Sequence, residues 1–316
     1  MASSTDRSTG HLNQGWTYTD RIQRGAEGVS VLEFYTERYP HSSPQIWLQR
    51  IEAGLVSIDG RQTRSDEELQ TGQLLTYHRP PWHEDEVPTH FQILHEDEHL
   101  IAVAKPSGLP TIPGGEFLEN TLLFLVRQRY PDRPAPIHRL GRGTSGIVIF
   151  ARSQIARRQL SADLRTGKLR KTYRALATGA PAENRFTVEA PIGQVPYPPL
   201  GRVHAVSPDG KPSRTECRIL ERRPNAVLLE VDIHTGRAHQ IRIHLAAAGH
   251  PLVGDPLYRI GGLPTDPPPI GRAPLPGDCG YHLHAQRVRF VHPADSKATT
   301  IICLPPRILQ TTCELG

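Results

Sequence analysis

The sequence has few cysteines and no local metal-binding motif. Its four cysteines lie far apart and form no C-x-x-C pair: Cys217, Cys279, Cys303 and Cys313. This pattern favours reduced thiols in a cytoplasmic protein over a disulfide framework or a zinc site. Sixteen histidines are present, but no H-E-x-x-H arrangement occurs, and His239, His244 and His250 lack the spacing of one helix face. We therefore expect no bound metal.

Long apolar runs are also missing. No run approaches the roughly 18 residues that cross a bilayer, so we expect no membrane partner. The first fifteen residues are rich in Ser, Thr and Gly and have no apolar core, unlike a secretory signal. We expect residues 1–17 to be a disordered tail. With 316 residues, 37% hydrophobic and 22% charged, the chain suits a soluble protein with about two domains.

The charge of the chain is modestly basic, with a net charge of +5 and a pI near 9.1. Such an excess is weak evidence for an anionic partner by itself. The distribution is more informative, because eight basic residues fall within 23 positions: Arg152, Arg157, Arg158, Arg165, Lys168, Arg170, Lys171 and Arg174. This run indicates either a nucleic-acid surface or a solvated helix face.

A small polar unit is predicted over residues 18–80. Apolar positions have helical spacing over 29–39 and again over 46–53. The following stretch, 55–61, reads as strand, Asp-Gly turn and return strand. Two helices followed by a hairpin resemble the S4-like RNA-binding domain; an unrelated small α+β module is the alternative.

Prolines and acidic residues over 81–90 predict a linker. Strand-like patterns follow, and we expect a larger domain over 91–306 and a tail over 307–316. Within this domain, spacing predicts a helix over 121–130, a helix beginning after Ser153, and strands over 147–151, 172–177, 213–220 and 227–233. Six prolines between Gly261 and Gly277 exclude regular structure there. A loop of this length is usually functional or disordered.

The most informative stretch of the larger domain is the run from His138 to Gly146, H-R-L-G-R-G-T-S-G. It resembles the active-site loop of the RluA-type RNA pseudouridine synthases, H-R-L-D-x-x-T-S-G. In that family the Asp after the leucine is catalytic, and here this position is Gly141. Many members have a second Asp two residues later, where this chain has Gly143.

The resemblance extends over roughly residues 92–293, in the order found in the family. It is carried by four further blocks: ILHEDEHLIAVAKPSGLP, KTYRALATG, HTGRAHQIRIHLAAAGHPLVGDPLY and YHLHAQRVRF. The altered loop and the last block resemble a plant and cyanobacterial branch most. The resemblance implies an α+β catalytic domain with a central, mostly antiparallel sheet, preceded by the S4-like domain.

The resemblance also implies an activity and a set of site residues. The chain is expected to isomerise uridine to pseudouridine in rRNA or tRNA, as a monomer and with no cofactor. Arg139 would fill the space left by the flipped base, Tyr173 would stack on it, and Arg242 would be the basic partner of the catalytic Asp. Residues expected to contact RNA are His138, Arg142, Thr144, Ser145, Arg237, His239 and Gln240. Without the resemblance, an ion-paired Arg139 and a core Tyr173 are the simpler alternatives.

Gly141 leaves two hypotheses open, since glycine can be neither nucleophile nor base. The chain is a synthase that uses a displaced carboxylate, or it is a catalytically impaired RNA-binding homologue. A buried arginine without its partner costs roughly 3–5 kcal/mol, so we expect an RNA phosphate or another carboxylate beside Arg242. Asp232 and Asp255 are the candidates, because they flank the same motif.

Overall fold

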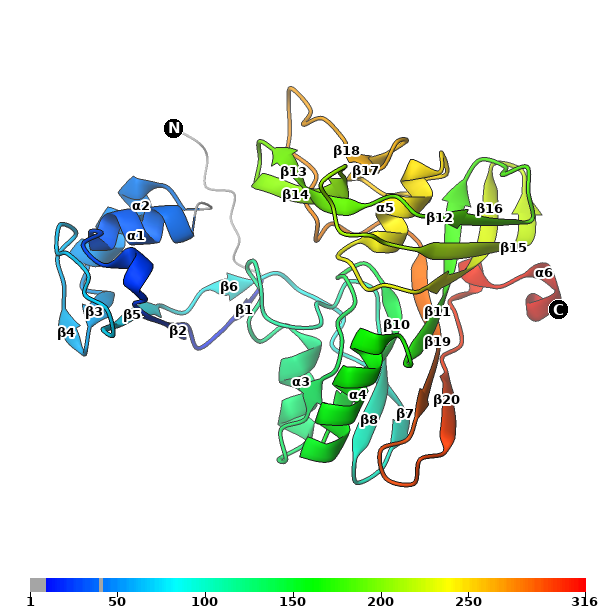
Figure 1. Cartoon of the computed structure of the whole chain (residues 1–316), viewed down its shortest axis with the longest axis horizontal. Helices are drawn as coiled ribbons and strands as arrows, with labels where there is room; N and C mark the ends of the chain where they lie inside the picture. The colour runs from blue at the N-terminus through cyan, green and yellow to red at the C-terminus, as the bar shows by residue number, and fades with distance from the viewer. Residues whose placement is uncertain (1–9, 40–41) are drawn as a thin grey trace. The chain divides into compact units, whose positions relative to one another are not determined.

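The structure, a computed structural model, describes residues 10–39 and 42–316. The chain forms two compact units, residues 1–85 and 86–316 (Figure 1). In the part of the chain that the structure describes, no helix is both long and apolar enough to cross a membrane.

The first unit packs two helices against a small antiparallel sheet. Helix α1 (Val31–Arg38) begins at a Ser30 capping box, and α2 (Pro44–Glu52) begins at Ser43 with proline in its first turn. The remaining elements are η1 (Arg24–Ala26) and a sheet in the order β2 (Trp16–Arg21), β5 (Leu74–Arg79), β3 (Val56–Ile58) and β4 (Arg61–Gln62). Both predicted helices and the hairpin that follows them are confirmed.

The predicted boundaries of this unit need correction. Strand β1 (His11–Leu12) pairs with β6 (His83–Glu84), and β2 begins at Trp16. The disordered tail predicted over 1–17 is therefore wrong for residues 10–17, while residues 1–9 lie outside the described part. The predicted linker over 81–90 is also partly strand. In both segments the backbone is ordered by hydrogen bonds to a part of the chain that is distant in sequence, and amino-acid composition does not indicate such pairing.

The second unit is built on a sheet of ten strands in the order β12-β15-β16-β11-β19-β10-β8-β7, with β20 on β19 and β9 on β10. Of its described strand pairs, all are antiparallel except β10 with β19. The mostly antiparallel sheet is thus confirmed. Its strands are β7 (Gln92–Glu96), β8 (Leu100–Lys105), β9 (Ala135–Pro136), β10 (Ser145–Ala151), β11 (Arg170–Thr178), β12 (Arg185–Val188), β15 (Thr215–Arg223), β16 (Ala226–Ile233), β19 (Leu283–Val291) and β20 (Ala298–Ile302).

Helices cover this sheet through two separate apolar clusters. Alternate residues of β10 supply both clusters, because side chains of a strand point to opposite faces. Helices α3 (Leu122–Arg129) and α5 (Gln240–Ala247) contribute to the larger cluster, and α4 (Gln154–Thr166) contributes to the other. The predicted N-cap at Ser153 is confirmed, with Oγ accepting from the Ala156 N–H at 3.2 Å.

Two expected irregular segments have structure. The tail predicted over 307–316 contains η2 (Arg307–Leu309) and α6 (Thr312–Leu315). It is attached to the sheet, since Glu314 forms an ion pair at 2.8 Å with the buried Arg174. The proline-rich segment includes β18 (Leu263–Pro264), paired with β17 (Tyr258–Arg259). A further hairpin is β13 (Ile192–Tyr197) with β14 (Gly201–Val206).

Candidate active site

The loop from His138 to Gly146 is hydrogen-bonded to the end of β8. The Lys105 side chain is 1% exposed. Its Nζ donates to the carbonyls of Pro106, Leu109 and Arg142 at 2.8, 2.6 and 3.1 Å. Burial lowers the pKa of Lys105 to about 7, whereas three carbonyl acceptors favour its ammonium form, which has three protons to donate. Lys105 therefore joins the loop to the strand that precedes it.

Two hydroxyl side chains extend this attachment. Ser107 Oγ donates to the Gly143 carbonyl at 2.8 Å. Thr111 Oγ1 donates to the Leu140 carbonyl at 2.9 Å and accepts from the Leu140 N–H at 3.1 Å. We call residues 105–111 the loop clamp. In the sequence, this segment is recognised only as part of a family motif. The one local feature that could have indicated its role in fixing the loop is a lysine placed at the end of an apolar strand, before Pro-Ser-Gly.

Tyr281 occupies the space beside both glycines of the loop. A Cβ on Gly143 would lie 2.9 Å from its ring, and a Cβ on Gly141 would lie 3.1 Å from its hydroxyl. The hydroxyl also lies 3.3 Å from Thr144 Oγ1. Apart from the chain neighbours Leu140 and Arg142, the described atoms within 4 Å of the Gly141 Cβ position are Tyr281 Oη and Thr144 Oγ1. Two hydroxyls thus flank the exposed position 141, and Tyr281 is a site residue that sequence reasoning missed.

Arg242 has a carboxylate partner within its own motif. Its Nε and Nη2 donate to Asp255 Oδ2 and Oδ1 at 2.7 and 2.8 Å, and the two side chains are 2% and 0% exposed. Nη1 donates to the Pro276 carbonyl at 3.0 Å. The guanidinium carbon lies 4.3 Å from the Tyr281 ring centroid. The expectation that another carboxylate would pair with Arg242 is confirmed for Asp255.

Neither candidate carboxylate lies within 4 Å of the Gly141 Cβ position. Besides the ion pair, Asp255 Oδ1 accepts from the backbone N–H groups of Leu257 and Tyr258 at 2.9 and 3.2 Å. Asp232 Oδ1 accepts from Thr172 Oγ1 at 2.7 Å. Asp255 therefore satisfies the charge of Arg242, but its enclosed oxygens hold it in that position.

Tyr173 lies in the larger apolar cluster, together with Leu140 of the loop, Ile241 of α5 and Tyr281. The fold thus brings together four motifs that lie far apart in the sequence. The Tyr173 side chain is 5% exposed, and burial raises the pKa of its hydroxyl. In this structure Tyr173 is therefore a core residue, as in the simpler alternative, and only a small part of it is exposed to solvent.

His239 is the residue before α5 and hydrogen-bonds to Tyr258. Tyr258 Oη donates to the His204 carbonyl at 2.8 Å. Its single proton is then used, so His239 Nδ1, also at 2.8 Å, must donate to Tyr258 Oη. Burial, then the charge of Arg242 and more weakly that of Arg139, lower the pKa of His239 to about 3. His239 is consequently neutral at physiological pH, and the exposed Arg139 is near it.

Several residues expected to contact RNA also form hydrogen bonds within the protein. Ser145 Oγ pairs with His284 Nδ1 at 2.9 Å, and the buried Gln240 bonds to Thr235, Arg237, Arg214 and Thr215. Arg142 Nε donates to the Gly108 carbonyl at 3.0 Å, with its guanidinium over the Phe117 ring. His138 is partly buried and accepts weakly from the Ile149 N–H at 3.4 Å. Arg139 and Arg237 are exposed.

Comparison with known proteins identifies the family. The family described as RNA pseudouridylate synthase matches residues 99–247. A Synechocystis protein named as an uncharacterised RNA pseudouridine synthase is 44% identical over 281 residues, covering 88% of this chain and 95% of its own. The chain belongs to the RNA pseudouridine synthases. RNA pseudouridine synthase 5 of Arabidopsis thaliana is 40% identical and covers 96% of both chains.

The family assignment makes the chain an RNA-modifying isomerase and confirms the resemblance drawn from the sequence motifs. The fold agrees: the human RNA pseudouridylate synthase domain containing 1 superposes with a TM-score of 0.55 at 23% identity. That match covers 72% of this chain and 89% of the human one.

Proposed function

We propose that the chain converts uridine to pseudouridine in a structured rRNA or tRNA, with the target base flipped against Tyr173 and the 138–146 loop. The reaction is an isomerisation: the N1–C1′ bond breaks, the base turns, C5 bonds to C1′, the C5 proton is released, and N1 takes up a proton. The observation that carries the proposal is the assembled site, in which the clamp holds the loop and Asp255 neutralises the buried Arg242.

Base flipping needs groups that compensate for lost stacking, which costs a few kcal/mol. Arg139 is exposed beside His239 and is free to enter the vacated space. Stacking on an aromatic ring contributes about 1–3 kcal/mol per base. Because Tyr173 is 5% exposed, we infer that the loop moves to uncover its ring when the base enters.

The bond-breaking step in this chain has no carboxylate at position 141. Burial raises the pKa of Tyr281, so its phenol is neutral at physiological pH and donates a hydrogen bond rather than accepting a proton. We propose that Tyr281 and Thr144 supply polar contacts to the nucleotide where the family's Asp would stand.

A second function is favoured by one observation: both oxygens of Asp255 are enclosed and paired with Arg242. If turnover requires a free carboxylate at the loop, the chain is an RNA-binding homologue that retains the site without the chemistry. The two functions share every contact of the site and differ only in turnover.

Release of tritium from [5-³H]uridine-labelled RNA separates these functions. The informative variants are Gly141→Asp and the double variant Gly141→Asp with Tyr281→Phe, since a Cβ at position 141 lies 3.1 Å from the Tyr281 hydroxyl. Gly141→Ala is the matched control, because it adds the Cβ without the carboxylate. We expect release by the native chain; silence in the native chain with release by either Asp variant establishes the RNA-binding homologue.

We further propose that RNA backbone contacts come from α4, the residues that follow it, and the first unit acting as an S4-like domain. Five residues of the basic run are exposed: Arg157, Arg158, Arg165, Lys168 and Arg170. Arg152, Lys171 and Arg174 are not, and Arg152 and Arg174 are ion-paired. The binding constant should therefore fall steeply with salt. A cytoplasmic, monomeric protein remains part of this proposal.

A further inference from the structure

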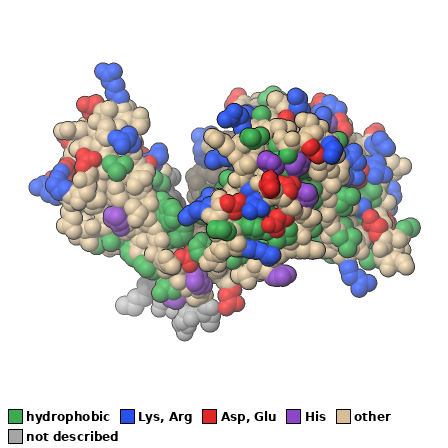
Figure 2. All heavy atoms as spheres, turned by 90° about the horizontal axis from the view of Figure 1, so that it is seen from below, with side chains coloured by type: hydrophobic (Ala, Val, Ile, Leu, Met, Phe, Trp, Pro, Cys, Tyr) green, Lys and Arg blue, Asp and Glu red, His purple; other side chains and the backbone are tan. Residues whose placement is uncertain are grey.

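A histidine–carboxylate cluster lies apart from the candidate active site, at the end of the sheet where β7 turns into β8 and β19 turns into β20 (Figure 1). It consists of His95, Asp97 and His292, whose ligand-type atoms all lie within 4.8 Å of one another. Figure 2 looks onto this end of the second unit and shows histidine and acidic side chains together at the surface. The proposed function uses none of the three.

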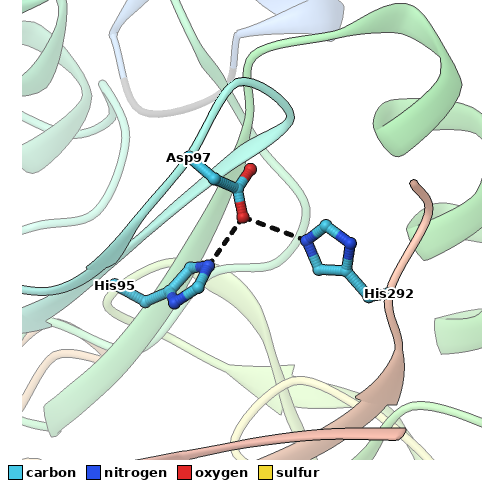
Figure 3. A group of neighbouring side chains, drawn as sticks. All are labelled: His95, Asp97 and His292. Atoms are coloured by element: carbon cyan, nitrogen blue, oxygen red, sulfur yellow. Dashed lines mark hydrogen bonds and ion pairs between the residues drawn. The ribbon is translucent and has the colours of Figure 1, made fainter. Parts of the chain in front are cut away.

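The three side chains converge on one point. His95 Nε2 and His292 Nε2 lie 2.7 and 3.0 Å from the same oxygen, Asp97 Oδ2 (Figure 3). The other oxygen, Asp97 Oδ1, accepts from the backbone N–H groups of His99 and Leu100 at 2.7 and 3.0 Å. The turn therefore fixes the carboxylate, and Oδ2 is left facing the two imidazoles.

We propose that this cluster binds a divalent transition-metal ion of the Zn²⁺ class. Two imidazole nitrogens and one carboxylate oxygen are a donor set that suits Zn²⁺. The side chains of His95 and Asp97 are 35% and 29% exposed, so a water molecule has access to the fourth position. The ion would tie two turns that are almost two hundred residues apart in sequence.

Small adjustments convert the hydrogen-bonded cluster into a metal site. Donor atoms around a tetrahedral Zn²⁺ are about 3.3 Å apart, given bonds of about 2.0–2.1 Å. The two imidazole nitrogens, now 2.7 and 3.0 Å from Asp97 Oδ2, must therefore move away from that oxygen by roughly 0.3–0.6 Å. His292 must also present an unprotonated Nε2. Its Nδ1 now accepts weakly from the Ala294 N–H at 3.3 Å. In the metal-bound form, Nδ1–H would donate to Asp295 Oδ1, which is 3.6 Å away. A carboxylate in that place is the usual outer partner of a metal-bound histidine.

The test is calorimetric titration of chelator-treated full-length protein with Zn²⁺ alone, with Co²⁺ absorption as a second readout of tetrahedral coordination. We expect one equivalent to bind, and at least tenfold weaker binding in His95→Gln and in His292→Gln. Asp295→Asn should weaken binding about tenfold through the outer shell. His99→Gln is the matched control, because His99 Nδ1 bonds to Ser153 Oγ and the residue is outside the cluster.

Melting temperatures measured with and without Zn²⁺ distinguish an ion site from a hydrogen-bonded contact. A metal site requires that Zn²⁺ raise the melting temperature of the native chain and of His99→Gln, but not that of His95→Gln. The His95→Gln variant should fold, because His95 is only partly buried and lies near the end of the edge strand β7. The proposal is overturned if Zn²⁺ binds His95→Gln and His292→Gln as tightly as the native chain, or raises no melting temperature. Neither readout depends on RNA modification.

Discussion

At the residue scale, positions 141 and 143 are glycines, and a tyrosine occupies the space beside them. Tyr281 stands against Gly143 and beside Gly141, and Asp255 rather than a loop carboxylate is paired with Arg242. A larger side chain at position 143 would meet the Tyr281 ring at 2.9 Å, tighter than normal carbon contacts. The two glycines and the tyrosine therefore pack as one unit. A larger side chain at either glycine requires that Tyr281 shift or be replaced by a smaller residue.

Tyr173→Leu should lower turnover on RNA at least tenfold, because it removes an aromatic face worth about 1–3 kcal/mol of stacking per base. Tyr173 is part of the core and 5% exposed, so this variant should also lose stability. Tyr173→Phe is the control that keeps ring and packing. Equal tritium release by the Leu and Phe variants, at matched folded fraction, would remove the stacking role.

At the element scale, the site depends on strand ends held together by backbone acceptors. The clamp joins the end of β8 to the loop that precedes β10 through Lys105, Ser107 and Thr111. The motif on α5 is attached to β15 through the buried Gln240. Such contacts give a loop a defined conformation without regular secondary structure. Their removal should disturb the conformation of the loop more than that of the sheet.

Lys105→Met should destabilise the protein by about 2–4 kcal/mol, because buried carbonyls lose their donor. Urea unfolding measures the change, with Lys168→Met at an exposed position as control. Turnover of the folded fraction should fall as well, since the Arg142 carbonyl loses its contact to Nζ. An unfolding free energy equal to that of the control would show that the clamp does not hold the loop.

The elements near the motifs were predictable from sequence, while long-range partners were not. Helical spacing gives α1 and α2 to within two residues at each end, and the serine N-cap gives the start of α4. The motifs placed Tyr173 and Arg242 at the site. The roles of Tyr281 and Lys105 were not predicted, because both depend on contacts with residues that are distant in the sequence. For the same reason, local histidine spacing excluded a metal site that the fold assembles from His95 and His292.

At the scale of the whole molecule, the second unit contains several histidines whose pKa is lowered by partial or complete burial. Burial lowers the pKa of His284 to about 4 and that of His138 well below 6.5, and His239 behaves likewise. In the unfolded chain each would titrate near 6.5. Since the unfolded state binds more protons below that pH, the stability from these groups is complete above pH 6.5 and lost as the pH falls towards 4.

The melting temperature should therefore fall between pH 7 and pH 4. In His284→Asn, unfolding should take up about one proton fewer over this range, so the melting temperature should fall less steeply with pH. The amide keeps an acceptor for Ser145 but does not titrate in this range. Calorimetry at several pH values measures both slopes. A melting temperature that is flat over this range, or an unchanged slope in the variant, would show that burial of these rings does not govern the acid response.

Tritium release from [5-³H]uridine RNA by the native chain is the decisive measurement, because it shows whether this site isomerises uridine although position 141 is glycine. We expect release that requires Arg242 and Tyr173, and similar release from Gly141→Ala. It is contradicted if the native chain binds the RNA without releasing tritium while Gly141→Asp, alone or with Tyr281→Phe, releases it.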